Sequence, residues 1–443
     1  MSQLTRAVPD RARPYALALA LGLLGLVILS LVGETPVDAM VYRMAAHAVL
    51  HDQPLYGVRL PSDHLGFTYP PFAALALVPL AAGSWALAHA WWILVNALGL
   101  AWLWDSCQRH SEMPRRWLLP CLAASVALEP VWENFDLGQI NLLLVPPILA
   151  DLLRPADARG RGIATGLVAG IKLTPVVYLG LLAVTGQWRA LRNAVWAMAA
   201  TAAVAAVFLP TASHEYWSHT VLHTDRFGHQ AFDSNQSVMG ALLRGFGTGA
   251  HVGPAWFVLS VLLGVLCLAV AAAWWRRGEH LLALGVTALA GLFGAPVSWT
   301  HHWVWCIPLG VALPAALRRA GLSPRTSARV TVAWFACFVI GPHLWVPRRH
   351  DRELRWGTLQ TVVGNAYLWF GLALLLLLAV AVRRVKPAVA PGSAPGAAEP
   401  TERRDASARP PGPPARTTPT SAWSRPDPPP GPAAPPVRRS PGH

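Results

Sequence analysis

The stretch at residues 254–275 reads PAWFVLSVLLGVLCLAVAAAWW and carries no charged side chain. A helix of about 20 apolar residues, rising about 1.5 Å per residue, spans the hydrocarbon core of a bilayer. Comparable stretches lie at residues 15–32, 85–104 and 367–382. Of the 443 residues, 54% are hydrophobic and 13% are charged, and the mean hydropathy is +0.39. The sequence therefore predicts an all-α, polytopic transmembrane protein rather than a water-soluble one.

The remaining apolar segments bring the prediction to about 10–12 spans. Arginines precede the first span, which places the amino terminus in the cytoplasm. If every predicted segment crossed the membrane, successive loops would alternate between the two sides, and the basic loops 105–116 and 187–192 would lie outside. We therefore expect the glycine-rich segment 162–182, which contains a Lys-Leu-Thr-Pro bend, to be broken or re-entrant. The other predicted spans are 69–82, 117–133, 139–153, 191–210, 280–297, 301–317, 328–346 and 358–382.

The net charge of +14 is concentrated in short loops and in residues 383–443, where ten Lys/Arg stand against four Asp/Glu. This is the positive-inside distribution, so it indicates contact with membrane lipids and excludes a nucleic-acid-binding face. Residues 383–443 also hold 17 of the 40 prolines, which predicts a disordered, basic cytoplasmic tail. We divide the chain into a transmembrane domain at 1–382 and this tail.

Two predicted outside loops, 33–67 and 211–252, are longer than a connection between neighbouring helices requires, which favours a functional role. In the first loop, apolar residues recur at helical spacing from Val37 to Val49 and predict a short helix in the membrane interface. Asp38 lies at the start of this helix. Two interpretations stay open: a helix cap, or a reactive carboxylate held beside the membrane surface.

Polar residues also interrupt the predicted spans. Lys172 lies inside one, where an ionisable group usually faces a cavity or a partner, and snorkelling to the interface is the alternative. His301 and His302 are neighbours at a span boundary; adjacent helix positions point about 100° apart, so we expect one to face a phosphate and the other to be structural. The polar residues that either cap a helix or bind an acceptor are Gln139, Asn141, Asn235 and Gln236.

Several short motifs follow one another in a distinctive order. They are Asp38-x-x-x-Tyr42, Pro54-Leu55-Tyr56, Phe67-Thr68-Tyr69-Pro70-Pro71, Gly138-Gln139-Ile140-Asn141 and Gly170-Ile171-Lys172-Leu173-Thr174-Pro175. In this order the chain resembles the actinobacterial polyprenol-phosphate-mannose-dependent mannosyltransferases of glycosyltransferase family 87, within the GT-C superfamily. The resemblance covers residues 15–382 and leaves the tail out.

The resemblance implies transfer of mannose, with inversion, from polyprenyl-phosphomannose to a mannose-bearing glycolipid or lipoglycan. It implies an α-1,2 linkage. The predicted topology puts the active site on the extracellular face of the cell membrane, and no cofactor is predicted. The resemblance also implies that Asp38 is the catalytic base, with Glu34 as the alternative. No metal site is predicted, because adjacent histidines are poor joint ligands.

A lipid phosphate leaving group needs cations or hydrogen-bond donors to offset the charge that it gains. The predicted donor-phosphate-binding residues are Arg43, His47, Lys172, His301 and His302, with His64, Arg348 and Arg349 as further candidates. The predicted acceptor-binding residues are Tyr42, Tyr69, Gln139, Asn141, Asn235 and Gln236.

A transporter or flippase of a lipid-linked sugar is the alternative function, because it also requires broken helices and polar groups near the middle of the membrane. The position of Asp38 separates the two. A transporter has no reason to place a carboxylate on an interfacial helix outside the membrane, so the transferase is the favoured hypothesis.

Overall fold

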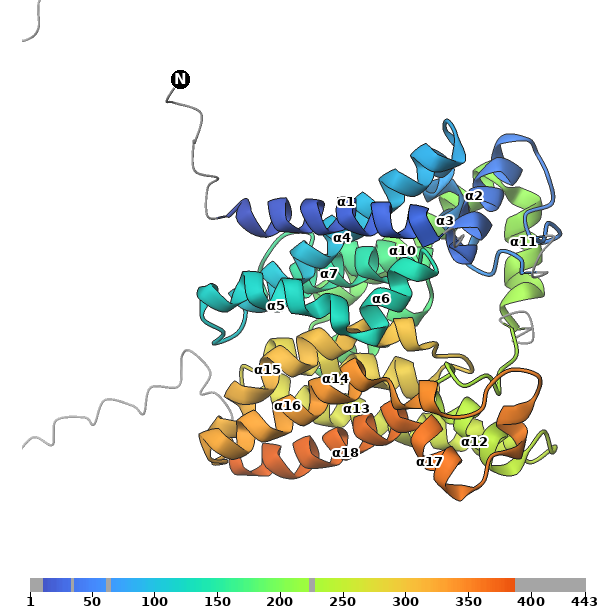
Figure 1. The fold of residues 1–443 in the computed structure, drawn as a ribbon. Helices are drawn as coiled ribbons and strands as arrows, with labels where there is room; N and C mark the ends of the chain where they lie inside the picture. Colours follow the sequence, from blue (N-terminus) through green and yellow to red (C-terminus); the bar gives the residue numbers. More distant parts are fainter. Residues whose placement is uncertain (1–10, 33–35, 61–64, 223–227, 387–443) are drawn as a thin grey trace, which may run out of the picture. The chain divides into compact units, whose positions relative to one another are not determined.

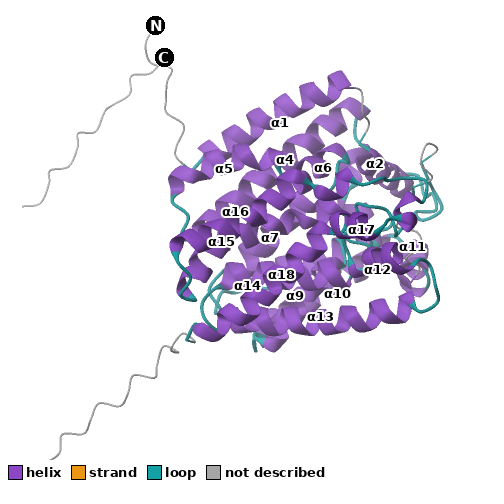
Figure 2. Cartoon of the chain, turned by 60° about the horizontal axis from the view of Figure 1, so that its bottom comes forward, coloured by secondary structure: helices purple, strands orange, loops and turns teal. Residues whose placement is uncertain are grey.

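The structure is a computed structural model that describes residues 11–32, 36–60, 65–222 and 228–386 (Figure 1). Within these ranges the regular secondary structure is helical, with isolated bridges in place of strands (Figure 2). This confirms the predicted all-α class. The predicted tail beyond residue 386 lies outside the described residues.

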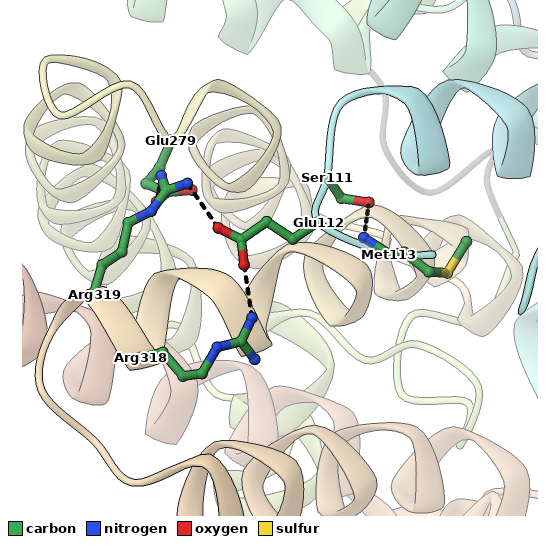
Figure 3. Close-up of polar contacts among 6 residues, drawn as sticks. All are labelled: Ser111, Glu112, Met113, Glu279, Arg318 and Arg319. Atoms are coloured by element: carbon green, nitrogen blue, oxygen red, sulfur yellow. Dashed lines mark hydrogen bonds and ion pairs between the residues drawn. The ribbon is translucent and has the colours of Figure 1, made fainter. Parts of the chain in front are cut away.

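The described helices connect two ends of the bundle (Figure 1). At the basic end, Glu112 accepts from Arg318 at 2.7 Å and from Arg319 at 2.9 Å, and Arg319 also pairs with Glu279 (Figure 3). These contacts join the loop after one helix, the start of a second helix and the last turn of a third. Short helices gather at the opposite end, which we call the cavity end (Figure 1). They are α2 (Val37–Leu50), α3 (Pro71–Ala76), α11 (Pro210–Ser218), α12 (Val238–Phe246) and α17 (Thr358–Gly364).

The longer helices run between the two ends. Four of the described helices are long and apolar enough to cross a membrane, in agreement with a polytopic membrane protein. They are α4 (Trp85–Arg109), α10 (Trp188–Phe208), α13 (Val252–Trp275) and α18 (Ala366–Ala381), which continues into a 3-10 turn. The bundle is completed by α1 (Arg13–Val32), α5 (Leu118–Ala124) with α6 (Glu129–Asp136), α7 (Asn141–Leu152), α14 (His280–Gly294), α15 (Cys306–Arg319) and α16 (Pro324–Ile340).

One predicted span is wrong. Residues 69–82 form only the six-residue helix α3 and a 3-10 turn at Val78–Ala81, which is too short to cross the hydrocarbon core. The segment is apolar because it packs inside the cavity end, where Leu77 and Leu80 are buried. The chain therefore enters α4 from the cavity end, and the basic loop 105–116 lies at the basic end.

The segment expected to be broken is a re-entrant pair of helices. α8 (Ile163–Ile171) ends at Lys172, and α9 (Val177–Val184) leads back toward the basic end. Arg161, just before α8, donates a hydrogen bond to Gln187, just after α9, so both ends of the pair lie together. Lys172 is consequently at the tip. The basic loop that follows α9 also lies at the basic end, which removes the conflict in the predicted topology.

Close helix packing fixes the position of this tip. A side chain at Gly166 of α8 would overlap the carbonyl oxygen of Ala194 in α10, so glycine is required for the approach. The start of α8 is held by Asp151 of α7, whose carboxylate accepts from the backbone N–H of Gly162 at 2.8 Å and from the hydroxyl of Thr165 at 2.8 Å. α7, α8 and α10 thus form one support for Lys172.

The predicted helix in the first outside loop is α2, and it packs differently from the expectation. Its buried residues include Ala39, Tyr42 and Ala46, so a face of α2 rests on protein. Val41 and Ala45, which belong to the apolar face predicted for this helix, are buried as well. The contact with the protein rather than with lipid is what holds Asp38 in a defined place.

Candidate active site

A cavity of about 870 Å³ lies at the cavity end. Its walls come from the start of α2, the loop at 65–70, the tip of the re-entrant pair, and residues 290–302. The polar residues that line it are Asp38, Tyr42, Thr68, Tyr69, Gln139, Lys172, Thr174 and His302. The rest of the lining is mainly apolar, and it includes Leu173, Val176, Leu222, Trp256 and Trp299.

Asp38 is placed by contact between α2 and the turn before α7. Its backbone N–H donates to the carbonyl oxygen of Leu137 at 3.0 Å. Gly138 follows with φ of +68°, and a Cβ there would lie 2.6 Å from the Cβ of Ala39, so only glycine fits this approach. The N-cap of α2 is Pro36, and no side chain caps the helix. The interpretation of Asp38 as a helix cap is therefore wrong.

The environment of the Asp38 carboxylate combines burial with two favourable partners. Burial raises its pKa to about 6, while a hydrogen bond from Gln139 and the charge of Lys172 lower it from a still higher value. A carboxylate with a pKa near neutral pH is able to accept a proton in a reaction.

Two tyrosine hydroxyls fix the orientation of Gln139. The Tyr42 hydroxyl donates to Gln139 Oε1 at 3.1 Å, and the Tyr69 hydroxyl lies 3.2 Å from the same oxygen. The two hydroxyls are 3.0 Å apart. An amide oxygen only accepts, so it faces the tyrosines and leaves the amide nitrogen to face Asp38.

Lys172 reaches the same cavity from the tip of the re-entrant pair. Its Nζ donates to Asn141 Oδ1 at 2.8 Å and lies 3.2 Å from Nε2 of His302. It also sits over the Tyr69 ring, 5.1 Å from the centroid. Because an ammonium group has no acceptor, His302 accepts at Nε2 and carries its proton on Nδ1. Lys172 is thus held by side chains rather than snorkelling to the interface.

Asn141 in turn belongs to a chain of buried amides. Its Nδ2 donates to Asn134 Oδ1 at 3.3 Å and to the backbone carbonyl oxygen of His301 at 3.2 Å. Asn134 donates to Asn96 Oδ1 at 3.3 Å. The donors all point away from Lys172, so an amide oxygen is the group that meets the ammonium.

Other predicted donor-phosphate residues lie outside the cavity lining. The Arg43 guanidinium donates to the carbonyl oxygen of Leu80 at 2.7 Å and so fastens α2 to the turn below it. His47 stacks on His51, further along α2. His301 is 3% exposed and does not line the cavity, whereas its neighbour His302 does. Phosphate binding by these residues stays a prediction.

Asn235 and Gln236 are also outside the cavity lining. Asn235 accepts from the backbone N–H of Ser298 at 2.9 Å and donates to the carbonyl oxygen of Pro296 at 3.2 Å. Gln236 donates to the carbonyl oxygen of Gly364 at 2.7 Å. Both side chains fasten loops, and their predicted acceptor binding stays untested.

The remaining candidates are three residues for phosphate binding and Glu34, the alternative base. Arg348 lies 3.9 Å from Asp233 Oδ2, and neither Arg348 nor Arg349 lines the cavity. Glu34 and His64 lie outside the described residues.

The sequence did not single out the apolar and aromatic part of the cavity. Tyr216, Trp256 and Trp299 line it, yet interfacial aromatic residues are common in membrane proteins and carry no specific signal. His302 was one of two adjacent candidates, and the 3-10 helix η7 (Thr300–Trp305) directs it, rather than His301, into the cavity.

Comparison with known proteins bears on this arrangement. The model of glycosyltransferase family 87 matches residues 67–299. A protein of Mycolicibacterium smegmatis named polyprenol-phosphate-mannose-dependent alpha-(1-2)-phosphatidylinositol mannoside mannosyltransferase is 34% identical over 79% of this chain and 85% of its own. The protein of the same name from Mycobacterium tuberculosis is 30% identical over 81% of this chain and 88% of its own.

The chain belongs to glycosyltransferase family 87. It is a membrane glycosyltransferase, and the resemblance predicted from the motif order is confirmed. No solved structure matches the chain. The residues matched by the family 87 model include Tyr69, Gln139 and Lys172, whereas Asp38 and His302 flank them on either side.

Proposed function

We propose that this family 87 enzyme transfers mannose from polyprenyl-phosphomannose to a mannose-bearing glycolipid, such as a phosphatidylinositol mannoside, or to a lipoglycan. The names of the M. smegmatis and M. tuberculosis relatives support the donor, the sugar and the α-1,2 linkage. The observation that carries the proposal is that Asp38 and Lys172 line the same cavity, which offers a base and a cation to one substrate pair.

In the proposed step the acceptor hydroxyl oxygen attacks the anomeric carbon of mannose. The new C–O bond forms as the bond between that carbon and the phosphate oxygen breaks, with inversion. Asp38 takes the hydroxyl proton, and polyprenyl phosphate leaves with the electron pair of the broken bond. Burial raises the pKa of Asp38 to about 6, so the base is in its reactive, deprotonated form at pH values above about 6.

The leaving phosphate gains negative charge, which Lys172 and His302 are placed to offset. Lys172 has three donor hydrogens, and the hydrogen bond to Asn141 and the contact with His302 occupy two of them. His302 keeps a donor at Nδ1. A donor that is already in place when charge develops stabilises the transition state without reorganisation.

The apolar part of the cavity suits a lipid-linked donor. Leu173, Val176 and Leu222 line it, and Leu222 is 74% exposed, so the lining reaches the surface of the bundle. A prenyl chain bound there would place its phosphate near the tip of the re-entrant pair. A water-soluble sugar nucleotide has no use for such a lining.

We place the active site on the extracellular face of the membrane. The basic loops, including the cluster of Arg318 and Arg319, lie at the end opposite the cavity, and basic loops stay in the cytoplasm. A donor bound in the outer leaflet would meet Asp38 directly. This sidedness is tested with a membrane-impermeant thiol reagent on a variant that lacks the native cysteines. One cysteine is introduced either at Asp52, just after α2 at the cavity end, or at Arg325, in the first turn of α16 at the basic end. Labelling of position 325 but not of 52 in intact cells would contradict it.

Purified enzyme, synthetic polyprenyl-phosphomannose and a phosphatidylinositol mannoside acceptor test the proposed transfer. We expect one mannose to be added to the acceptor, with the new linkage identified by chemical analysis of the product. Movement of intact polyprenyl-phosphomannose across vesicles without any mannosylated product would favour the transporter instead.

A further inference from the structure

We infer that Gln139 is a positioning residue that orients the Asp38 carboxylate, rather than a ligand of the acceptor sugar. The inference rests on the proposed function, because it assumes that Asp38 is the base. It replaces the acceptor-binding role predicted for Gln139 from the sequence.

The hydrogen-bonding capacity of Gln139 is directed at protein groups. Its Oε1 lies 3.1 Å from the Tyr42 hydroxyl and 3.2 Å from the Tyr69 hydroxyl, and its amide nitrogen faces Asp38. The side chain is only 5% exposed. An acceptor hydroxyl that bound Oε1 would have to displace a tyrosine.

The two tyrosine hydroxyls favour one orientation of the Gln139 amide, with its oxygen toward them. Rotating the Gln139 amide by 180° would turn its NH₂ toward two hydroxyls and its oxygen toward the Asp38 carboxylate. Two acceptors facing each other while buried cost free energy, so the observed orientation is the stable one. The amide NH₂ is thereby left to donate to the Asp38 carboxylate, which favours one orientation of that carboxylate.

The backbone strengthens this assignment. Gln139 N–H donates to the carbonyl oxygen of Asn134 at 2.8 Å, and Trp92 Nε1 donates to the carbonyl oxygen of Gly138 at 2.7 Å. The turn that carries Gln139 is therefore tied to α6 and α4. A rigid turn suits a residue that aims another side chain, because small movements of a base reduce the rate steeply.

Several titratable groups interact with Asp38 or line the same cavity, and a change at Gln139 must be judged against them. They are Lys172 at the re-entrant tip, Tyr42 on α2, Tyr69 in the loop before α3, His302 on η7 and Glu133 on α6. None of these residues is itself replaced in a Gln139 variant, although Tyr42 and Tyr69 hydrogen-bond to Gln139 Oε1.

The test is the pH profile of kcat/KM in Gln139→Glu. Glutamate keeps the shape of the side chain and the oxygen that faces the tyrosines. It replaces the donor NH₂ with an oxygen, which creates a second carboxyl group next to Asp38. Two adjacent carboxyl groups share a proton, which raises the pKa of the pair. We expect the acidic limb of the profile to move to higher pH by at least one unit, with activity partly restored at pH 8–9.

An unmoved acidic limb together with a raised KM for the acceptor would overturn the inference and restore Gln139 as an acceptor ligand. Gln108→Glu is the matched control, because Gln108 lies at the basic end and donates to the Met113 carbonyl oxygen at 3.2 Å. Its profile should match that of the unmodified enzyme.

Gln139→Met is the second variant, for use if the glutamate variant does not fold. It removes the bond to Asp38, together with the oxygen that accepts from Tyr42 and Tyr69, without adding charge. We expect kcat to fall at least tenfold with the acceptor KM within about twofold, since positioning acts on the transition state. A raised KM for the acceptor with an unchanged kcat would overturn the inference. Loss of activity in Asp38→Asn is measured in parallel, so that failure of the positioning role is separated from failure of the base.

Discussion

Gln139, in the turn before α7, and Asn141, the first residue of α7, present opposite ends of their amides to Asp38 and Lys172. The Gln139 nitrogen donates to Asp38, whereas the Asn141 oxygen accepts from Lys172 at 2.8 Å. The turn after α6 and the first residue of α7 therefore contact both the proposed base and the proposed phosphate ligand.

Replacement of Lys172 tests the phosphate ligand. Lys172→Met keeps most of the length and removes a buried charge, so thermal stability in detergent should hold or rise. We expect the KM for polyprenyl-phosphomannose to rise at least tenfold, and Lys172→Arg to recover part of the loss if the larger guanidinium fits beside Asn141. Donor kinetics that are unchanged in the methionine variant would show that Lys172 is structural.

The pH dependence tests the state of Asp38. Burial raises the pKa of this carboxyl to about 6 from an ordinary value near 4, so the protonated fraction grows as the pH falls below 6. A base must be deprotonated, so kcat/KM should fall about tenfold per pH unit below that value. The measurement is a kcat/KM profile from pH 4.5 to 8. An acidic limb near pH 4 would contradict the buried, partly desolvated carboxylate.

A small side chain at Gly166 should displace the tip of the re-entrant pair. In Gly166→Ala the added methyl meets the Ala194 carbonyl oxygen, so α8 must move away from α10. We expect a lower melting temperature and a weaker donor affinity. Gly264→Ala in α13 is the control, because nothing lies within 4 Å of a Cβ there and alanine favours a helix by about 1 kcal/mol. Equal behaviour of the two variants would argue against this packing as the support of Lys172.

Truncation tests the predicted tail. Deleting residues 390–443 should leave transfer by the purified enzyme within about twofold, because the site is built from residues before 303. The comparison requires equal amounts of membrane-inserted protein, measured by fluorescence-detected size exclusion. A well-inserted truncation without activity would show that the tail contributes to the reaction.

Hydropathy and local composition predicted the all-α class and the broken segment at 162–182, and motif order singled out Asp38, which lines the cavity. They could not predict that residues 69–82 fail to cross, since a short apolar segment buried in protein and a membrane span have the same composition. They also could not predict that His302 and Lys172 line the cavity whereas His301 and Arg43 do not. Those assignments depend on helix rotation and on which backbone carbonyl oxygens already hold a cation, as Leu80 holds Arg43.

The most direct test of the account is the rate of mannose transfer in Asp38→Asn, with Asp52→Asn as its control. Asp52 is exposed just beyond the other end of α2, and its φ of +52° is one that asparagine also adopts. We predict a loss of about 10²–10⁴-fold in kcat for Asp38→Asn, as expected when a general base is removed, and near-normal activity for the control. Asp38→Asn protein that is folded and inserted, yet retains most of its activity, would contradict the role of Asp38 as the base.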